Sequence, residues 1–171
     1  MSRPEHPRVA AISSLLADSG ATGRVLELTG SARTAAEAAG ELGVPIGAIA
    51  NSLVFDVDGA PLLVLTSGAH RVDVARVAAL LGVRDVRPAS ADFVRRHTGQ
   101  AIGGVAPIGH PEPIGTLVDI ELARYEPVWA AAGHPHAVFP TSYEELLGLT
   151  GGTAAEVGEG PLVRPETVEA R

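Results

Sequence analysis

Apolar and polar positions alternate along this chain in short blocks, and the clearest pair of blocks predicts a β-hairpin. One apolar run covers residues 49–57 and a second covers residues 61–66. Between them lies Asp58-Gly59, a dipeptide that favours the tight turns joining antiparallel strands. The alternation and the turn signal agree, so we predict two paired strands here.

Helices are indicated where apolar residues recur at helical spacing between capping residues. Thr34 and Glu37 have the spacing of a capping box, and Gly43 follows at the end of an Ala-rich segment. Signals of this kind predict helices over residues 9–17, 34–43, 72–82, 90–99 and 142–149.

Short apolar runs predict further strands over residues 25–28, 83–86, 116–122, 128–132 and 137–139. The strands do not alternate strictly with helices, and no G-x-G-x-x-G motif follows the first strand, so the predicted fold class is α+β. Beyond Gly151-Gly152 the pattern fades into acidic sequence interrupted by Pro and Gly. We therefore expect a single domain over residues 1–152 and an acidic, partly disordered tail over residues 153–171.

Composition excludes several chemistries. Hydrophobic residues make up 46% of the 171 residues but aromatic residues only 4%, so an aliphatic core is expected. The chain has no Cys, which excludes disulfides, thiolate metal sites and cysteine nucleophiles. All 13 Lys and Arg residues are Arg, which excludes Schiff-base and P-loop lysines.

Charge and hydropathy indicate where the protein acts and what it binds. No segment resembles a targeting signal, and no apolar run reaches the roughly 20 residues of a membrane helix, so we expect a cytoplasmic protein without membrane contact. The net charge of −7 argues against an extensive nucleic-acid footprint. Residues 71–96 nevertheless hold six Arg against three Asp. This cluster is either a solvated helix face or a dock for phosphates, with Arg71 the favoured phosphate ligand.

Several segments, taken in order, resemble a known family. They are Ile49-Ala-Asn-Ser-Leu-Val-Phe55, Leu65-Thr-Ser-Gly-Ala-His-Arg-Val-Asp73, Thr98-Gly-Gln-Ala-Ile-Gly-Gly-Val-Ala-Pro-Ile-Gly109, Trp129-Ala-Ala-Ala-Gly-His-Pro-His-Ala-Val-Phe139 and Thr150-Gly-Gly152. Their order and spacing resemble the YbaK/EbsC family, the free-standing relatives of the editing domain of prolyl-tRNA synthetases. The resemblance implies a mixed, largely antiparallel curved sheet or barrel surrounded by helices.

The resemblance also implies an activity, which is hydrolysis of the ester joining a wrong amino acid to the 3′ end of a tRNA. A synthetase pocket discriminates poorly against smaller or isosteric side chains, so a second site removes what the first admits. The implied partners are aminoacylated tRNA, with tRNA-Pro as the specific candidate, and an aminoacyl-tRNA synthetase. No cofactor and no metal are implied.

The segment from Gly103 and Gly104 through Val105 to Pro107 matches the glycine-rich loop of that family. Glycines let the backbone approach a substrate closely, and exposed N–H groups can hold a carbonyl oxygen. The resemblance thus assigns Gly103 and Gly104 to catalysis, and Val105 and Pro107 to substrate binding. Taken alone, a Gly-Gly pair also fits a simple bend in a strand.

Asn51 stands where the family has a lysine associated with substrate binding and catalysis. An amide can donate to a carbonyl or a ribose hydroxyl but carries no charge. Three interpretations stay open: a neutral catalytic replacement, weak or lost activity, or another cation, such as Arg71 or a His, in the same space. The adjacent Ser52 has no G-x-S-x-G context and no neighbouring His, so a serine nucleophile is not favoured.

Further residues are assigned to the implied substrate pocket. Val54, Val105 and Ile108 are expected to form apolar walls that read the size of the amino-acid side chain. Asp119 lies among apolar neighbours and needs a partner if it is buried. It either pins a loop through hydrogen bonds or orients groups in the pocket.

His134 and His136 are two residues apart, across Pro135. They contact the aminoacyl group or ribose as a pocket wall, or they face solvent from a loop. A zinc site would need a third and a fourth ligand, and His110 is the one obvious supplement, so we predict no metal.

Three functions remain in view. A deacylase that acts on mischarged tRNA is favoured. A non-catalytic module that binds aminoacyl-tRNA is supported by Asn51, and a small-molecule hydrolase or ligand-binding protein is supported by the acidic net charge.

Overall fold

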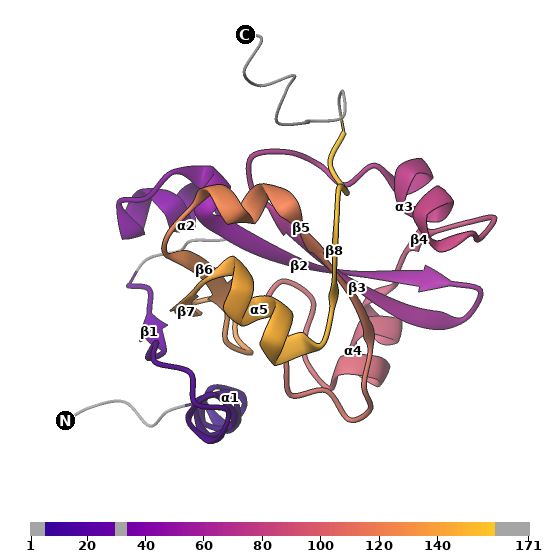
Figure 1. The fold of residues 1–171 in the computed structure, drawn as a ribbon. Helices are drawn as coiled ribbons and strands as arrows, with labels where there is room; N and C mark the ends of the chain where they lie inside the picture. Colours follow the sequence, from indigo (N-terminus) through magenta and orange to yellow (C-terminus); the bar gives the residue numbers. More distant parts are fainter. Residues whose placement is uncertain (1–5, 30–33, 160–171) are drawn as a thin grey trace, which may run out of the picture.

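The computed structural model describes residues 6–29 and 34–159, and its centre is a mixed β-sheet (Figure 1). The strand order is β1-β7-β6-β2-β3-β5-β8, and β4 pairs with β2 beside this path. The strands are β1 (Leu26–Glu27), β2 (Ile49–Val57), β3 (Ala60–Ser67), β4 (Arg87–Pro88), β5 (Gly115–Asp119), β6 (Val128–Ala131), β7 (Ala137–Thr141) and β8 (Thr153–Ala155). The end strands β1 and β8 do not pair, so the sheet is open and not a closed barrel.

Antiparallel and parallel pairs both occur in the sheet. The pairs β2–β3, β2–β4, β1–β7 and β6–β7 are antiparallel, whereas β2–β6, β3–β5 and β5–β8 are parallel. The hairpin β2–β3 has the predicted position, and its turn residues Asp58 and Gly59 have φ values of 51° and 88°. Positive φ at both central residues is what a type I′ turn requires, so Asp-Gly fixes the register.

The helices begin and end at the capping residues that the sequence indicates. Thr34, Asp73, Ser90 and Ser142 each accept a hydrogen bond from a backbone N–H of the first turn. The helices are α1 (Pro7–Asp18), α2 (Ala35–Leu42), η1 (Ile46–Ala48), α3 (Val74–Leu81), α4 (Ala91–Thr98), η2 (Ile120–Arg124) and α5 (Tyr143–Thr150). None of the helices in the described ranges is long and apolar enough to cross a membrane.

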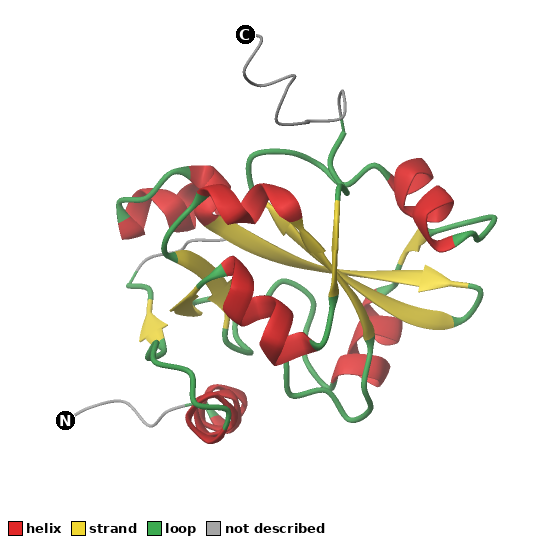
Figure 2. Ribbon diagram, in the orientation of Figure 1, coloured by secondary structure: helices red, strands yellow, loops and turns green. Residues whose placement is uncertain are grey.

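Helices cover both faces of the sheet (Figure 2). One face packs against α1, α4 and α5, with Leu16, Val94 and Leu146 meeting Leu63 and Leu65 of β3. The opposite face packs against α3 and, further along, against α2. Both faces are therefore buried, and the predicted α+β class with a mixed sheet surrounded by helices is confirmed.

Two predicted strands differ from the structure. The segment 83–86 is not a strand; the chain pairs with β2 only at Arg87 and Pro88. The predicted strand 116–122 ends at Asp119, because the Asp119 side chain accepts a hydrogen bond from Glu121 N–H and starts η2. A carboxylate that bonds its own backbone competes with the strand ladder, and Leu122 is then buried from a helix.

The fold also continues past the expected boundary at Gly152. Residues Thr153–Ala155 form β8, which pairs with β5, and Val157 is fully buried. Without β8, β5 would be an exposed edge strand, so this short pairing covers it. No sign of this strand is visible in the sequence, because a pairing of only three residues is too short to show an alternating pattern and the surrounding segment is acidic. The rest of the expected tail, residues 160–171, lies outside the described residues.

Candidate functional site

A cavity of about 470 Å³ lies beside the outer edge of β2. Strand β6 pairs with this edge only at Ile49 and Ala50, and β4 only at Phe55 and Asp56. Residues 51–53 therefore have no strand neighbour on that side. The loop that follows α4 lies opposite this part of the edge, so the cavity lies between a strand edge and a loop.

Two residues of the glycine loop line this cavity and have unpaired backbone N–H groups. Gly103 and Val105 both line it, and within the described residues neither of their N–H groups has a hydrogen-bond acceptor. Gly103 has φ of 92°, a conformation that other residues rarely adopt. At Gly104 an added Cβ would lie 2.8 Å from backbone atoms of His134 and Pro135, so only glycine allows this close packing.

The loop is held in place by a residue that the sequence analysis did not select. Gln100 is buried, and its Oε1 accepts a hydrogen bond from Ala106 N–H at 2.7 Å. Its Nε2 donates to Ile108 O at 3.4 Å. His110 Nε2 donates to Ala106 O at 2.9 Å, and burial lowers the pKa of His110 against the weaker opposing effect of this bond. The loop geometry is thus fixed before any substrate binds.

Asn51 and Ser52 border the cavity from opposite faces of β2. In the ladder Asn51 is opposite Thr66, whereas Ser52 is opposite Leu65, which belongs to the main core. The Asn51 amide forms no hydrogen bond with a described residue. The Ser52 hydroxyl is buried and also lacks a partner among the described residues. The sequence analysis considered Ser52 only as a nucleophile; its strand position beside Asn51 is the signal that it faces the site.

His134 and His136 lie in the turn between β6 and β7, next to the glycine loop. Their ring centroids are 5.5 Å apart, and His6 stacks on His134 at 5.0 Å. Desolvation lowers the pKa of His134, and the neighbouring His6 and His136 lower it further, while Glu27 opposes them. His134 therefore favours the neutral form near neutral pH.

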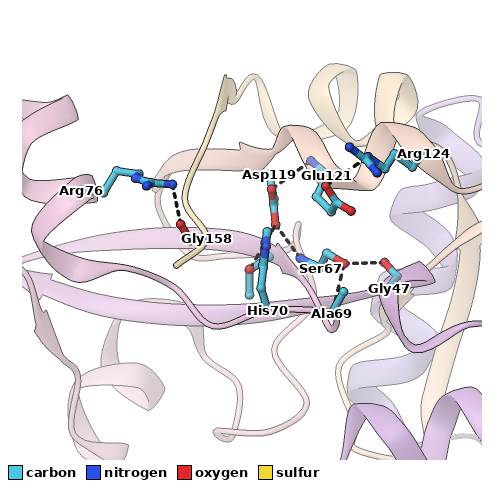
Figure 3. A network of polar contacts seen from close by, with 10 residues as sticks. Gly47, Ser67, Ala69, His70, Arg76, Asp119, Glu121, Arg124 and Gly158 are labelled. Carbon is cyan, nitrogen blue, oxygen red and sulfur yellow. Dashed lines mark hydrogen bonds and ion pairs between the residues drawn. The ribbon is translucent and has the colours of Figure 1, made fainter. Parts of the chain in front are cut away.

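Asp119 lies in a polar network away from the cavity (Figure 3). It is 1% exposed, accepts hydrogen bonds from Thr66 Oγ1 and Ser67 N–H, and pairs with His70. The network joins the ends of β3 and β5 and is consistent with the interpretation that Asp119 pins a loop. Thr66, which donates to Asp119, is the ladder partner of Asn51, so β3 connects Asp119 to the edge of the cavity.

The remaining predicted residues divide into two groups. Val54 lines the cavity with Val105, whereas Pro107 and Ile108, which were expected to bind substrate, do not line it; Pro107 is buried and Ile108 is half-buried. Arg71 is exposed and does not line the cavity; its carbonyl accepts a hydrogen bond from Glu159 N–H. In the described part of the chain, no group of three or more His, Asp or Glu residues is placed to hold a metal ion.

Comparison with known proteins identifies the family. The sequence profile of the aminoacyl-tRNA editing domain matches residues 29–149. The uncharacterized protein YwhH of Bacillus subtilis (strain 168) is 30% identical over 123 residues, which is 71% of this chain and 78% of YwhH. A proline–tRNA ligase of Geobacter metallireducens is 32% identical over 68 residues, which is 40% of this chain but only 12% of the ligase.

Solved structures are similar over nearly the whole chain. A crystal structure described as a proposed trans-editing enzyme for prolyl tRNA synthetase has a TM-score of 0.87 and 40% identity, covering 92% of this chain and all of the other. The hypothetical protein APE2540 has a TM-score of 0.80 and 33% identity, covering 87% of this chain and 99% of that one. On the evidence of the sequence match and the shared fold, the chain belongs to the family of aminoacyl-tRNA editing domains.

Proposed function

We propose that this protein hydrolyses the ester bond of mischarged tRNA in trans, and that tRNA-Pro is its substrate. One observation carries the proposal: a cavity flanked by two backbone N–H donors, of Gly103 and Val105, that have no acceptor among the described residues. Donors of this kind, fixed in advance, stabilise the negative charge that develops on an ester oxygen during hydrolysis. The descriptions of the relatives support the choice of tRNA-Pro.

The reaction needs little beyond position, because an aminoacyl ester is already activated. Water adds to the carbonyl carbon while Gly103 and Val105 hold the carbonyl oxygen. The ester C–O bond then breaks, and the departing ribose oxygen takes up the proton that the water releases. The neighbouring ribose hydroxyl orients the water, and the Asn51 amide donates to that hydroxyl or to the carbonyl.

Side-chain selection follows from the apolar lining. Val54, Val94 and Val105 line the cavity, and Ala131 lines it from β6. Aliphatic walls bind a small apolar side chain, and each methylene that fits is worth about 0.8 kcal/mol. A wall of this kind discriminates mainly by size. We therefore expect the amino acids removed to be small and uncharged.

A pair of glycine variants tests the loop. Gly103 and Gly59 have similar φ values, 92° and 88°, and an added Cβ meets nothing within 4 Å at either. Gly103→Ala and Gly59→Ala therefore carry a similar backbone strain of about 1 kcal/mol. Only Gly103→Ala should lower kcat/KM on mischarged tRNA, by about a hundredfold if one oxyanion donor is displaced. Equal activity in the two variants would exclude the loop as the site.

A second function, binding of aminoacyl-tRNA without hydrolysis, is supported by Asn51 in place of the family lysine. Asn51→Lys separates the two functions. A charged hydrogen bond is worth about 1.5–3 kcal/mol against about 0.5–1.5 for a neutral one, so Asn51→Lys should raise kcat/KM about tenfold in a working deacylase. If the wild type binds a panel of mischarged tRNAs but hydrolyses none of them, and the Asn51→Lys variant is equally inactive, the protein is a binding module.

A further inference from the structure

A second hollow, of about 260 Å³, lies next to the ester cavity and is lined by cationic and imidazole groups. His6 and Arg8 reach it from α1, Arg95 from α4, and His134 from the β6–β7 turn. None of its described lining residues is acidic. Arg8 and Arg95 are exposed and form no ion pair with a described residue, whereas the adjacent Arg96 lies over the Phe93 ring.

The two imidazoles present hydrogen-bond donors. His6 Nδ1 accepts a hydrogen bond from Arg8 N–H at 3.1 Å, and His134 Nδ1 accepts one from His136 N–H at 3.2 Å. A nitrogen that accepts carries no proton, so each neutral ring carries its proton on Nε2. Neither Nε2–H has an acceptor among the described residues. Two guanidinium groups and two N–H donors thus converge on one hollow.

The hollow and the ester cavity are lined by nearby residues of the same two segments. Ala101 lines the hollow, while Ile102 and Gly103 line the cavity. Likewise Ala131 lines the cavity, and Gly133, two residues further on, lines the hollow. Both openings therefore border the segment after α4 and the segment from the end of β6 into the following turn. A chain of linked phosphates whose end lies in the cavity would reach the hollow within its last nucleotides.

We propose that the hollow formed by His6, Arg8, Arg95 and His134 binds the phosphodiester backbone next to the 3′ end of the tRNA. This inference rests on the proposed function for the orientation of the RNA, with its 3′ end in the ester cavity. Binding of the RNA backbone itself does not require hydrolysis. Guanidinium groups suit phosphate oxygens because they donate in pairs from a planar fork. The assignment moves the phosphate contact from Arg71, which the sequence favours, to α1 and α4. It also explains how an acidic protein binds RNA through a small local patch.

The test is the salt dependence of RNA binding, measured by fluorescence anisotropy with a hairpin RNA that carries no amino acid and ends in a single-stranded 3′-CCA. The double variant Arg8→Gln/Arg95→Gln should weaken binding at least about tenfold at low salt. The slope of log K against log salt should fall by about 1.4, since single strands contribute about 0.7 per phosphate. Arg8→Lys/Arg95→Lys should keep most of the slope, because the charges remain.

The matched control is Arg24→Gln/Arg84→Gln, which removes the same charge from exposed residues outside both lining sets. Hydrolysis of an aminoacyl ester of adenosine, which has no phosphate, should be unchanged in Arg8→Gln/Arg95→Gln; a loss there would mean that the variant damages the ester site itself. Equal weakening by the control, a larger effect of Arg71→Gln, or no RNA binding by the wild type would each overturn the proposal. If the wild type binds the hairpin with the expected slope but hydrolyses no mischarged tRNA, the proposed phosphate-binding hollow is supported and the proposed deacylase activity is refuted.

Discussion

Replacing Ser52 by Ala should make the protein more stable and less active. The Ser52 hydroxyl is buried without a hydrogen-bond partner among the described residues. A buried hydroxyl left unpaired costs about 1–3 kcal/mol. Ser52→Ala removes this cost and loses only the packing of one oxygen. We expect the free energy of unfolding to rise by about 1 kcal/mol, which raises Tm by about 2–4 °C in a domain of this size.

Ser67→Ala is the matched control, because Ser67 lies on the same face of the hairpin with its hydroxyl fully used. It donates to Gly47 O at 2.7 Å and accepts from Ala69 N–H at 3.2 Å. It is also completely buried. Removing it leaves partners unpaired, so the free energy of unfolding should fall by about 1–3 kcal/mol. Replacing Ser by Ala is therefore predicted to raise the free energy of unfolding at position 52 and to lower it at position 67.

The assays are urea unfolding of both variants and kcat/KM on mischarged tRNA. If the free Ser52 hydroxyl bonds the substrate, its loss costs about 0.5–1.5 kcal/mol, or about two- to twelvefold in kcat/KM. Ser52→Ala that is destabilised like Ser67→Ala would show that the hydroxyl has a partner in the folded protein. A more stable variant with unchanged kcat/KM would refute the contact with substrate.

Two further predictions concern stability. The pKa of His110 is lowered by burial, so the folded state binds its proton less readily than the unfolded state, whose ordinary pKa is 6.5. The stability that this group contributes is complete above pH 6.5 and is lost as the pH falls below that value. In urea unfolding, His110→Gln should therefore flatten the decline in the free energy of unfolding between about pH 7.5 and pH 5. A decline that is unchanged in the variant would contradict this prediction. Val157 is fully buried beyond the expected domain boundary, so Val157→Ala should lower the free energy of unfolding by about 2 kcal/mol, and a change near zero would mean that the segment after β8 does not pack.

Sequence patterns predicted those parts of the fold that local chemistry decides. The β2–β3 hairpin depends on Asp58-Gly59, and each described α-helix begins at a capping side chain within the same segment, such as Thr34 or Ser90. The failures at β4 and β8 occurred where a distant segment decides. Strand β8 exists because β5 has a free edge, and β4 forms where β2 has one. A strand of two or three residues has no periodicity of its own to detect.

The candidate site shows the same division. Gly103 and Val105 could be selected because their segment resembles the family's glycine-rich loop, and Val54 as an apolar wall of the pocket that the resemblance implies. Gln100 could not be selected, because its role depends on Ala106 lying within 2.7 Å after the chain has turned. The cationic hollow joins α1, α4 and the β6–β7 turn, which are far apart in sequence. Charge counting found arginines but could not decide which of them share a surface.

One of the buried unpaired groups in the described part of the chain lies where a substrate would supply a partner. The buried side-chain atoms without a partner in the described part of the chain are Ser52 Oγ, Trp129 Nε1 and His136 Nδ1. Ser52 lines the cavity, whereas Trp129 packs against Leu28 and Val138, and neither Trp129 nor His136 lines the cavity or the hollow. An unpaired buried hydroxyl costs stability, so folding alone does not account for the one beside the cavity. An ester with its water and ribose can bond such groups on binding, which lets a site without lysine gain affinity from hydrogen bonds that folding left open.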